Sequence, residues 1–414
     1  MPRQPGDVAV SGAETHAGDV AIHFADPGTV LADARPESVG LLSAPVAAAV
    51  CEVRSYEQGR AAKGKVAFPS AVGLMGARGR VVVRDASGHS YLYRDATTKA
   101  AVAERVRATT GTLYDLASVS KLFTSVVVVQ LLEWGCVELE APVASYLPEF
   151  AASGKQAVTV RQLLTHTSGL VAVLPLWSSH GDATARLRAV MDQPLDHPPG
   201  AVYLYSDLNL ITLGVLVERV TGLTLDQVVH DRVTAPLGMS ATGYNPLGRL
   251  ATRNQVAATE YQAAPARGMV WGEVHDENAW SLGGVAGHAG VFSTVDDLAV
   301  LCQMLLNGGT YRGRRILSQE SVRAMVSDHN TAFPGHAHGL GFELDQRWYM
   351  QGMSGPVTAG HTGYTGTSVV VDFDAQTFAV LLTNRVHPSR DTASTNPARC
   401  AWARGLAAAS PRTA

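Results

Sequence analysis

The segment LASVSKLFTSVVVVQLLEWG (residues 116–135) joins a polar start to an almost wholly apolar run, which predicts a buried helix. Ser118 and Lys121 stand three positions apart near its start, and residues three apart are neighbours on one face of a helix. A lysine beside a buried run needs a polar partner, because burying an unpaired charge is costly. The segment therefore predicts a serine hydroxyl next to a lysine amine at the start of a core helix.

Such a pair suits nucleophilic catalysis. If burial lowers the pKa of the Lys121 amine, that amine can take the proton of the Ser118 hydroxyl. The free N–H groups at a helix start can also stabilise an oxyanion. The alternative interpretation is a capping serine and a lysine whose aliphatic stem lies along the helix, and it is the default for an isolated Ser-x-x-Lys match.

Two later segments carry polar groups at the ends of regular elements. YLYSDLN (203–209) precedes an apolar helix, and its Tyr205 could move a proton between a nucleophile and a leaving group. HTGYTG (361–366) precedes a β-branched strand, and glycines at a strand edge allow the backbone to approach a ligand closely. Alone, the first segment also fits a helix N-cap and the second fits a turn that enters a strand.

Taken together and in this order, the segments Ser118–Lys121, Tyr205–Asp207 and His361–Gly363 resemble the three motifs of the serine β-lactamase and penicillin-binding-protein superfamily. The segment RQLLTHTSGL (161–170) also resembles one that recurs in the branch of class C β-lactamases and family VIII esterases. The resemblance covers roughly residues 38–408. It implies a serine hydrolase or acyltransferase that works through a covalent acyl-enzyme.

The resemblance also implies a role for each matching residue. Ser118 is the nucleophile, Lys121 and Tyr205 share the roles of base and acid, and His361 holds the basic position of the third motif. The backbone N–H groups of Ser118 and Tyr364 would form the oxyanion hole. The remaining substrate-binding residues that it implies are Asp207 and Gly363.

Two of these positions depart from the family pattern. Asp207 stands where the family has Asn, and its carboxylate favours a protonated Lys121, which shifts the base role toward Tyr205. His361 stands where penicillin-recognising enzymes have Lys, and a neutral histidine binds a substrate carboxylate poorly at pH 7. We therefore expect esterase-like activity on a small-molecule or peptidyl ester, thioester or amide.

Several alternatives stay open beside this expectation. One is a thioesterase or acyltransferase of secondary metabolism that releases or cyclises peptides from a carrier-protein-bound acyl thioester. Others are a D-aminopeptidase, a D-Ala-D-Ala carboxypeptidase or a β-lactamase. A non-catalytic acyl-binding homologue is the alternative from another class of protein.

Strand patterns lie at both ends of the chain and helical patterns lie between them. This predicts an α/β (α+β) fold of the β-lactamase/transpeptidase type, with an antiparallel sheet flanked by helices and a mostly helical inserted domain. We expect a flexible arm over 1–36, a core over 37–135 and 286–414, and an insert over 136–285. The expected strands are 67–76, 80–85, 89–93, 339–344, 367–372 and 377–383, and the terminal helices are 39–53 and 392–408.

Composition narrows the partners and the compartment. A net charge of −3 offers no attraction for nucleic acid or anionic lipid, and no apolar run reaches membrane-spanning length. The N-terminus lacks a basic start followed by an apolar stretch, so we expect a cytoplasmic protein. The four cysteines show no metal spacing and are expected to be buried free thiols: Cys51, Cys136, Cys302 and Cys400.

Residues 271–290 are rich in aromatic, acidic and glycine residues. We expect this loop near the pocket, with Trp271 and Trp280 as its walls. The group His275, Asp276 and His288 has two interpretations, a metal or substrate site and a structural loop, and we favour the second because the spacing fits no metal signature.

Other histidines and motifs carry less. We expect His166 to be a structural hydrogen-bonding residue, and the group His329, His336 and His338 to lie in a solvated loop. The sequence lacks Gly-x-Ser-x-Gly, His-Glu-x-x-His and a phosphate-binding glycine loop, so we expect no cofactor and no metal.

Overall fold

A computed structural model describes residues 22–60, 65–179 and 181–410. Its centre is an eight-stranded sheet with the order β1-β3-β2-β15-β14-β13-β12, in which β4 also pairs with β3. All neighbours are antiparallel except β1 and β3, which run parallel. The strands are β1 (Ala32–Asp33), β2 (Ser70–Ala77), β3 (Arg80–Tyr91), β4 (Val106–Arg107), β12 (Glu343–Leu344), β13 (Thr358–Thr362), β14 (Ser368–Asp372) and β15 (Thr377–Thr383).

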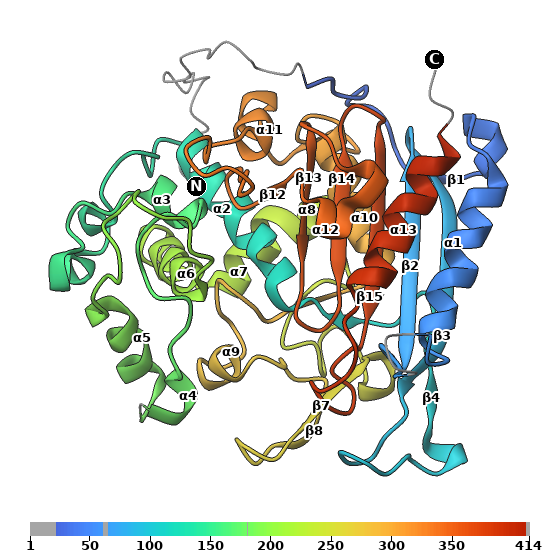
Figure 1. Ribbon diagram of the computed structural model, residues 1–414. Coiled ribbons are helices and arrows are strands. Elements are labelled where there is room, and N and C mark those ends of the chain that lie inside the picture. Colours follow the sequence, from blue (N-terminus) through green and yellow to red (C-terminus); the bar gives the residue numbers. More distant parts are fainter. Residues whose placement is uncertain (1–21, 61–64, 180, 411–414) are drawn as a thin grey trace.

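The N-terminal and C-terminal parts of the sheet meet where β2 pairs with β15 over the whole length of β15. Successive side chains of a strand point to opposite faces, and β15 is buried on both. Val380 and Leu382 join the core on one face, while Ala379 and Leu381 join the core on the other. Helices α1 (Ser43–Tyr56) and α13 (Asn396–Ala409) cover this second face side by side (Figure 1).

The opposite face of the sheet is covered by α10 (Val295–Leu306) and by the layer around α2 (Lys121–Glu133). Residues 121–131 of α2 are all buried, as the apolar run predicts. The α-helix begins at Lys121, and Ser118 lies in the preceding 3-10 turn Ala117–Ser120. Ala117 has a positive φ of 48°, so a sharp bend separates the strand-like entry from the helix.

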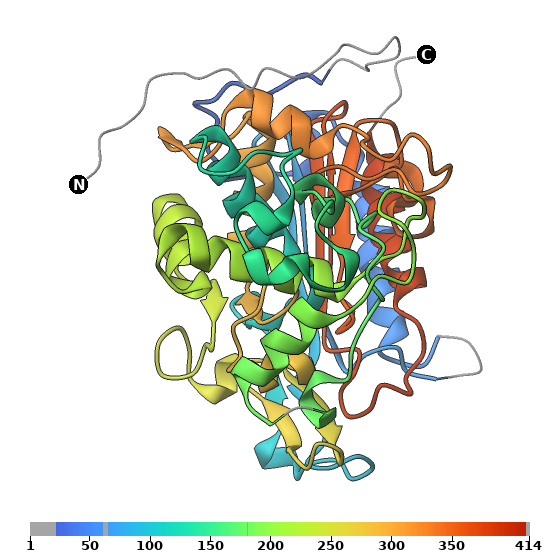
Figure 2. The same ribbon diagram turned by 90° about the vertical axis from the view of Figure 1, so that its left-hand side faces the viewer.

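Between α2 and α10 the chain is mainly helical, and its helices lie in front of the sheet when seen from the side (Figure 2). Strands also occur there, where few were expected: β7 and β8 form a hairpin, and β6 joins β5 and β9 in a small sheet. Strand β5 (Tyr114–Asp115) precedes α2. The elements between α2 and α10 are α3 (Val160–Leu164), α4 (Leu176–Ser179), α5 (Ala183–Asp192), α6 (Asp207–Thr221), α7 (Leu225–Val229), α8 (Ala235–Leu237), β6 (Gly243–Tyr244), β7 (Ala258–Gln262), β8 (Gly268–Trp271), α9 (Glu277–Ser281) and β9 (Val291–Ser293).

The remaining elements follow α10. They are β10 (Thr310–Tyr311), β11 (Arg314–Arg315), α11 (Gln319–Val326) and α12 (Arg347–Met350). No single helix in the described part of the chain has the length and apolarity to cross a bilayer. The bent pair formed by Asp207–Thr221 and Leu225–Leu237, with 80° between its two parts, passes that test by length and composition only.

Several expectations are corrected by the structure. Residues 1–21 of the expected arm lie outside the described residues, but 22–36 pack on the core through apolar side chains such as Phe24, which meets Phe373 edge to face. The expected break at Ser87-Gly88 is wrong, because β3 is one continuous strand. Strand β13 was not expected, and of the cysteines only Cys302 is buried, although all four are free.

Candidate active site

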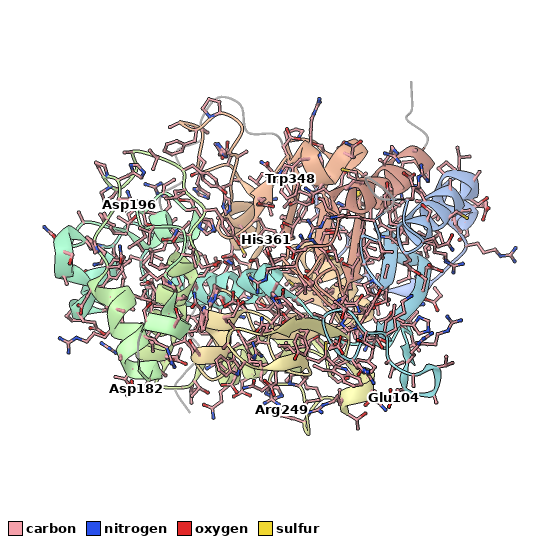
Figure 3. All side chains as sticks on the ribbon, turned by 60° about the horizontal axis from the view of Figure 1, so that its bottom comes forward. Glu104, Asp182, Asp196, Arg249, Trp348 and His361 are labelled. Atoms are coloured by element: carbon pink, nitrogen blue, oxygen red, sulfur yellow. The ribbon has the colours of Figure 1, made fainter. Side chains whose placement is uncertain are left out.

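The three sequence motifs meet at one cavity of about 470 Å³. Ser118, Tyr205 and His361 all line it, although they come from the turn before α2, the segment before α6 and strand β13. In Figure 3 the labelled His361 and Trp348 lie near each other, between the C-terminal strands and the green helices. The other lining residues are Glu343, Trp348, Thr362, Gly363, Tyr364, Arg385, Ser394, Thr395, Asn396 and Arg399.

The turn that carries Ser118 is held by the hairpin after β13. The hydroxyls of Thr365 and Thr367 donate to the backbone carbonyls of Asp115 and Leu116, at 2.8 and 2.9 Å. The carboxylate of Asp115 accepts the backbone N–H of Ala117 at 2.8 Å, which stabilises the positive φ there. These bonds fix the backbone immediately before Ser118.

The amine of Lys121 is completely buried and lies between three oxygen atoms. It donates to Ser118 Oγ at 3.0 Å, to Asp207 Oδ1 at 2.7 Å and to the backbone carbonyl of His288 at 3.1 Å. Burial lowers the pKa of Lys121, but the charge of Asp207 and the phenol of Tyr205 outweigh it and raise that pKa above its ordinary value. Lys121 is therefore an ammonium ion in the resting protein.

Tyr205 lies against this ammonium, with Lys121 Nζ 4.9 Å from the centre of its ring. Burial raises the pKa of Tyr205 to about 12, against the lowering effect of Lys121. His166 positions the segment: its Nδ1 accepts the backbone N–H of Ser206 at 3.1 Å, and its ring centroid lies 4.5 Å from that of Tyr205. His166 is thus a structural residue that sets the place of the phenol.

His361 brings no positive charge to the cavity. Burial, and then the charge of Lys121, lower its pKa to about 3. Its Nδ1–H donates to the carbonyl of Thr362 at 2.8 Å, so its Nε2 is a lone-pair acceptor, and this buried atom has no partner among the residues that the structure describes. His361 is a neutral acceptor in the cavity wall.

The cavity nevertheless contains cations that the motifs do not include. Arg385 donates to the carbonyl of Tyr364 at 3.3 Å, and its guanidinium lies 5.2 Å from the centre of the Tyr364 ring. Arg399 on α13 donates to the carbonyl of Gly363 at 2.7 Å. An arginine inside an alanine-rich helix was the available signal for Arg399. Glu343, whose pKa burial raises to about 7, had no signal in the sequence.

Tyr364, a predicted oxyanion donor, lies at the cavity, whereas the two tryptophans predicted as its walls do not. In the described part of the chain, the backbone N–H of Tyr364 has no hydrogen-bond acceptor, and Tyr364 lines the same cavity as Ser118. Trp271 and Trp280 do not line it, so the prediction that they wall the pocket is wrong. Trp271 instead stacks on Tyr91 with ring centroids 4.2 Å apart, and Trp280 lies under the guanidinium of Arg267.

The histidines and carboxylates of the 271–290 loop are paired with each other or with the core. His275 Nε2 lies 2.9 Å from Glu260, and His288 Nε2 lies 2.9 Å from Asp276. Asp207, Asp276 and His288 offer ligand atoms within 4.8 Å of one another. Lys121 and the Asp276–His288 pair already engage those atoms, which favours the structural interpretation of the loop.

One of the three loop histidines after α11 differs from expectation: His336 is exposed and His329 is half-buried, but His338 is not solvated. His338 is buried, donates to the carbonyl of Gly339 at 2.7 Å and packs edge to face on His166, so it is not solvated. It is buried because the strand-like bridge between His338 and Glu343 turns the loop inward.

Comparison with known proteins agrees with this arrangement. Residues 56–400 match the sequence model of the Beta-lactamase family. A "Putative D-alanyl-D-alanine carboxypeptidase" of Escherichia coli K12 is 34% identical over 364 residues, which are 80% of this chain and 82% of that protein.

Solved structures with the same fold include a penicillin-binding protein homologue from Caulobacter crescentus, with a TM-score of 0.67 and 22% identity over 89% of this chain and 99% of that one. Another is EstCE1, described as a hydrolase with promiscuous acyltransferase activity, with a TM-score of 0.66 and 22% identity over 87% of this chain and 98% of that one. The chain belongs to the Beta-lactamase family of serine hydrolases.

Proposed function

We propose that this chain is a hydrolase that forms an acyl-enzyme at Ser118 on small-molecule or peptidyl esters, thioesters or amides. The observation that carries the proposal is the contact of 3.0 Å between Ser118 Oγ and Lys121 Nζ at the wall of an open cavity. A nucleophile and its proton-transfer partner need this distance.

The groups around Ser118 suit the steps of acyl transfer. Ser118 Oγ attacks the acyl carbon, and the N–H groups of Ser118 and Tyr364 receive the developing oxyanion, where one donor is typically worth about 10²–10³ in rate. Tyr205, a neutral phenol beside Ser118, donates a proton to the leaving group, and the proton that Ser118 loses to Lys121 restores the phenol. Water, or another acyl acceptor, then cleaves the ester at Ser118.

Two features bear on the substrate. The neutral His361 and the exposed aromatic rim of Trp348 and Tyr364 suit uncharged ester or thioester groups, including one carried by a partner protein. The guanidinium of Arg385 in the same cavity favours a second candidate, release of a C-terminal residue whose carboxylate it would bind. The similarity to the Escherichia coli relative, a putative D-alanyl-D-alanine carboxypeptidase, points the same way.

The test combines labelling with a substrate panel. The wild type should be labelled by a fluorophosphonate and should turn over at least one member of a panel of p-nitrophenyl esters, a peptidyl thioester, D-amino-acid amides, a D-Ala-D-Ala peptide and nitrocefin. Ser118→Ala should lose both signals. Ser125→Ala is the matched control, since Ser125 is buried in α2, just after the turn that carries Ser118, and its hydroxyl has no partner among the described residues.

The outcomes separate the alternatives. Full turnover by Ser118→Ala would contradict the proposal. A stable adduct at Ser118 that never turns over would instead indicate an acyl-binding protein. Product analysis with an amine or alcohol competing against water separates hydrolysis from acyl transfer or cyclisation.

A further inference from the structure

Lys121 is an ammonium ion in the resting protein, so its nitrogen has no lone pair with which to act as a base. A lysine ammonium has three protons, and all three have acceptors here: Ser118 Oγ, Asp207 Oδ1 and the carbonyl of His288. Lys121 can accept the Ser118 proton only if one of its own protons moves away. That proton must therefore move to one of the three acceptors of Lys121.

Only one of the three acceptors can hold a proton. Ser118 is the group that must lose one, and the carbonyl of His288 does not titrate in this range. The carboxylate of Asp207 makes the shortest of the three contacts, 2.7 Å, and its side chain is 22% exposed, so it can also exchange a proton with water. Tyr205 is no substitute, because its neutral phenol is not a standing base.

Asp207 faces four other titratable groups, whose charges bear on this proton exchange. The titratable groups that face it are Lys121 from α2, Tyr205 from the segment before α6, Asp276 at the N-cap of α9, and His288 from the glycine-rich loop. Asp276 is held by the backbone N–H of Ala279 at 2.7 Å and by the ring of His288 at 2.9 Å. A proton on Asp207 would leave one carboxylate charge among these side chains instead of two.

We propose that Asp207 is the proton-holding partner of Lys121 in the activation of Ser118, an inference that rests on the proposed function. The O–H bond of Ser118 breaks as an N–H bond forms on Lys121, and the Oγ electron pair forms the bond to the acyl carbon. In the same step a second N–H bond of Lys121 breaks and an O–H bond forms on Asp207. The total number of protons in the group does not change.

This proton balance has a consequence for the pH profile. The resting ammonium–carboxylate pair and the reactive amine–acid pair hold the same number of protons, so kcat/KM needs no net loss of a proton from Lys121. The wild-type profile should therefore show no alkaline rise that belongs to this lysine. In Asp207→Asn the lysine must release a proton to water first, so activity should rise about tenfold per pH unit until Lys121 titrates.

The experiment measures kcat/KM for an activated ester between pH 5.5 and 9.5. Asp207→Asn should be at least about 100-fold slower than wild type at pH 6 and should regain activity with rising pH, while Asp207→Glu should keep the flat profile. Asp296→Asn is the matched control: this carboxylate also lies in the first turn of a helix and pairs with a cation, Arg84, at 2.7 Å, but far from the cavity. If Asp207→Asn does not fold, Asp207→Ser carries the same prediction.

The result that overturns the inference is a flat profile with near wild-type kcat/KM in the uncharged variants. An alkaline limb in the wild type that persists unchanged in Asp207→Asn would also overturn it. Failure of the proposed function is a separate result, because Ser118→Ala would then keep its activity whatever the profile of the Asp207 variants.

Discussion

Gly363 should not tolerate a side chain, although its φ does not require glycine. A Cβ at this position would lie 2.3 Å from the backbone carbonyl of Leu116 and 2.1 Å from Thr367 Oγ1. A Cβ essentially never lies within 3.0 Å of such atoms, ordinary contacts begin at 3.4 Å, and Thr367 Oγ1 itself donates to that carbonyl. The methyl group must therefore push the backbone just before Ser118 by about 1 Å, and a displacement of that size typically costs about 10²-fold in rate.

The assay for Gly363→Ala measures kcat and KM with an activated ester, and unfolding by denaturant. We expect kcat to fall about 100-fold and the free energy of unfolding to fall by about 1–3 kcal/mol, as for other overpacked sites. Gly355→Ala is the control, because its Cβ would meet its nearest neighbour, Thr358 Oγ1, at an ordinary 3.6 Å.

Two results would refute this reasoning. One is a Gly363→Ala variant with wild-type kcat. The other is full recovery in the double variant Gly363→Ala/Thr367→Ala, which removes the clash with the hydroxyl but leaves the clash with the Leu116 carbonyl. Partial recovery is the expected outcome, since the backbone contact remains.

Three further predictions concern Arg385, the cysteines and Glu260. Arg385→Gln should lower kcat/KM about 10–100-fold for substrates that carry a carboxylate near the scissile bond, and little for neutral esters, because a charged hydrogen bond is worth about 1.5–3 kcal/mol; equal losses on both substrate types would contradict an anion-binding role. In the folded protein a thiol reagent should modify the exposed Cys51 and Cys136, whereas the buried Cys302 should react only after unfolding, and mass spectrometry of labelled peptides separates them. Despite burial, which raises it, hydrogen bonds from His275 and Arg390 lower the pKa of Glu260 to about 2. The stability that Glu260 contributes should thus be present above its ordinary pKa of 4.5 and be lost as pH falls toward 2. The difference in unfolding free energy between wild type and Glu260→Gln should shrink over this range, and a constant difference would contradict the assignment.

The core elements near the nucleophile could be predicted because their patterns are local. The helix over 121–133 follows from an unbroken apolar run, and β14 and β15 follow from β-branched segments around a turn. The sequence predicts that Ser118 and Lys121 share one helix, but α2 begins only at Lys121, because the left-handed Ala117 is imposed by Asp115 and by a threonine hydroxyl 250 positions away. No local pattern contains that contact.

The residues that line the cavity were also predicted incompletely, because they too depend on contacts between distant segments. Trp271 was expected at the pocket because of the unusual composition of its loop, but its ring stacks on Tyr91 at the end of β3. Glu343 lies in a two-residue strand, too short to show a period, and reaches the cavity only because β12 pairs with β13. Such partners depend on how distant segments pair, which a motif spacing does not encode.

The charge of the cavity could not be predicted from the three motifs alone. His361 in place of Lys suggested a site without a cation for a substrate carboxylate, and the structure agrees that His361 is neutral. The cavity nevertheless contains cations, because Arg385 and Arg399 contribute guanidinium groups to it from segments outside the three motifs. Each of these arginines donates to two backbone carbonyls, but Arg399 is buried, whereas Arg385 is only half-buried and lies at the aromatic rim, so Arg385 is the cation that a substrate can reach. The choice between a neutral ester and an anionic peptide therefore depends on Arg385 rather than on position 361.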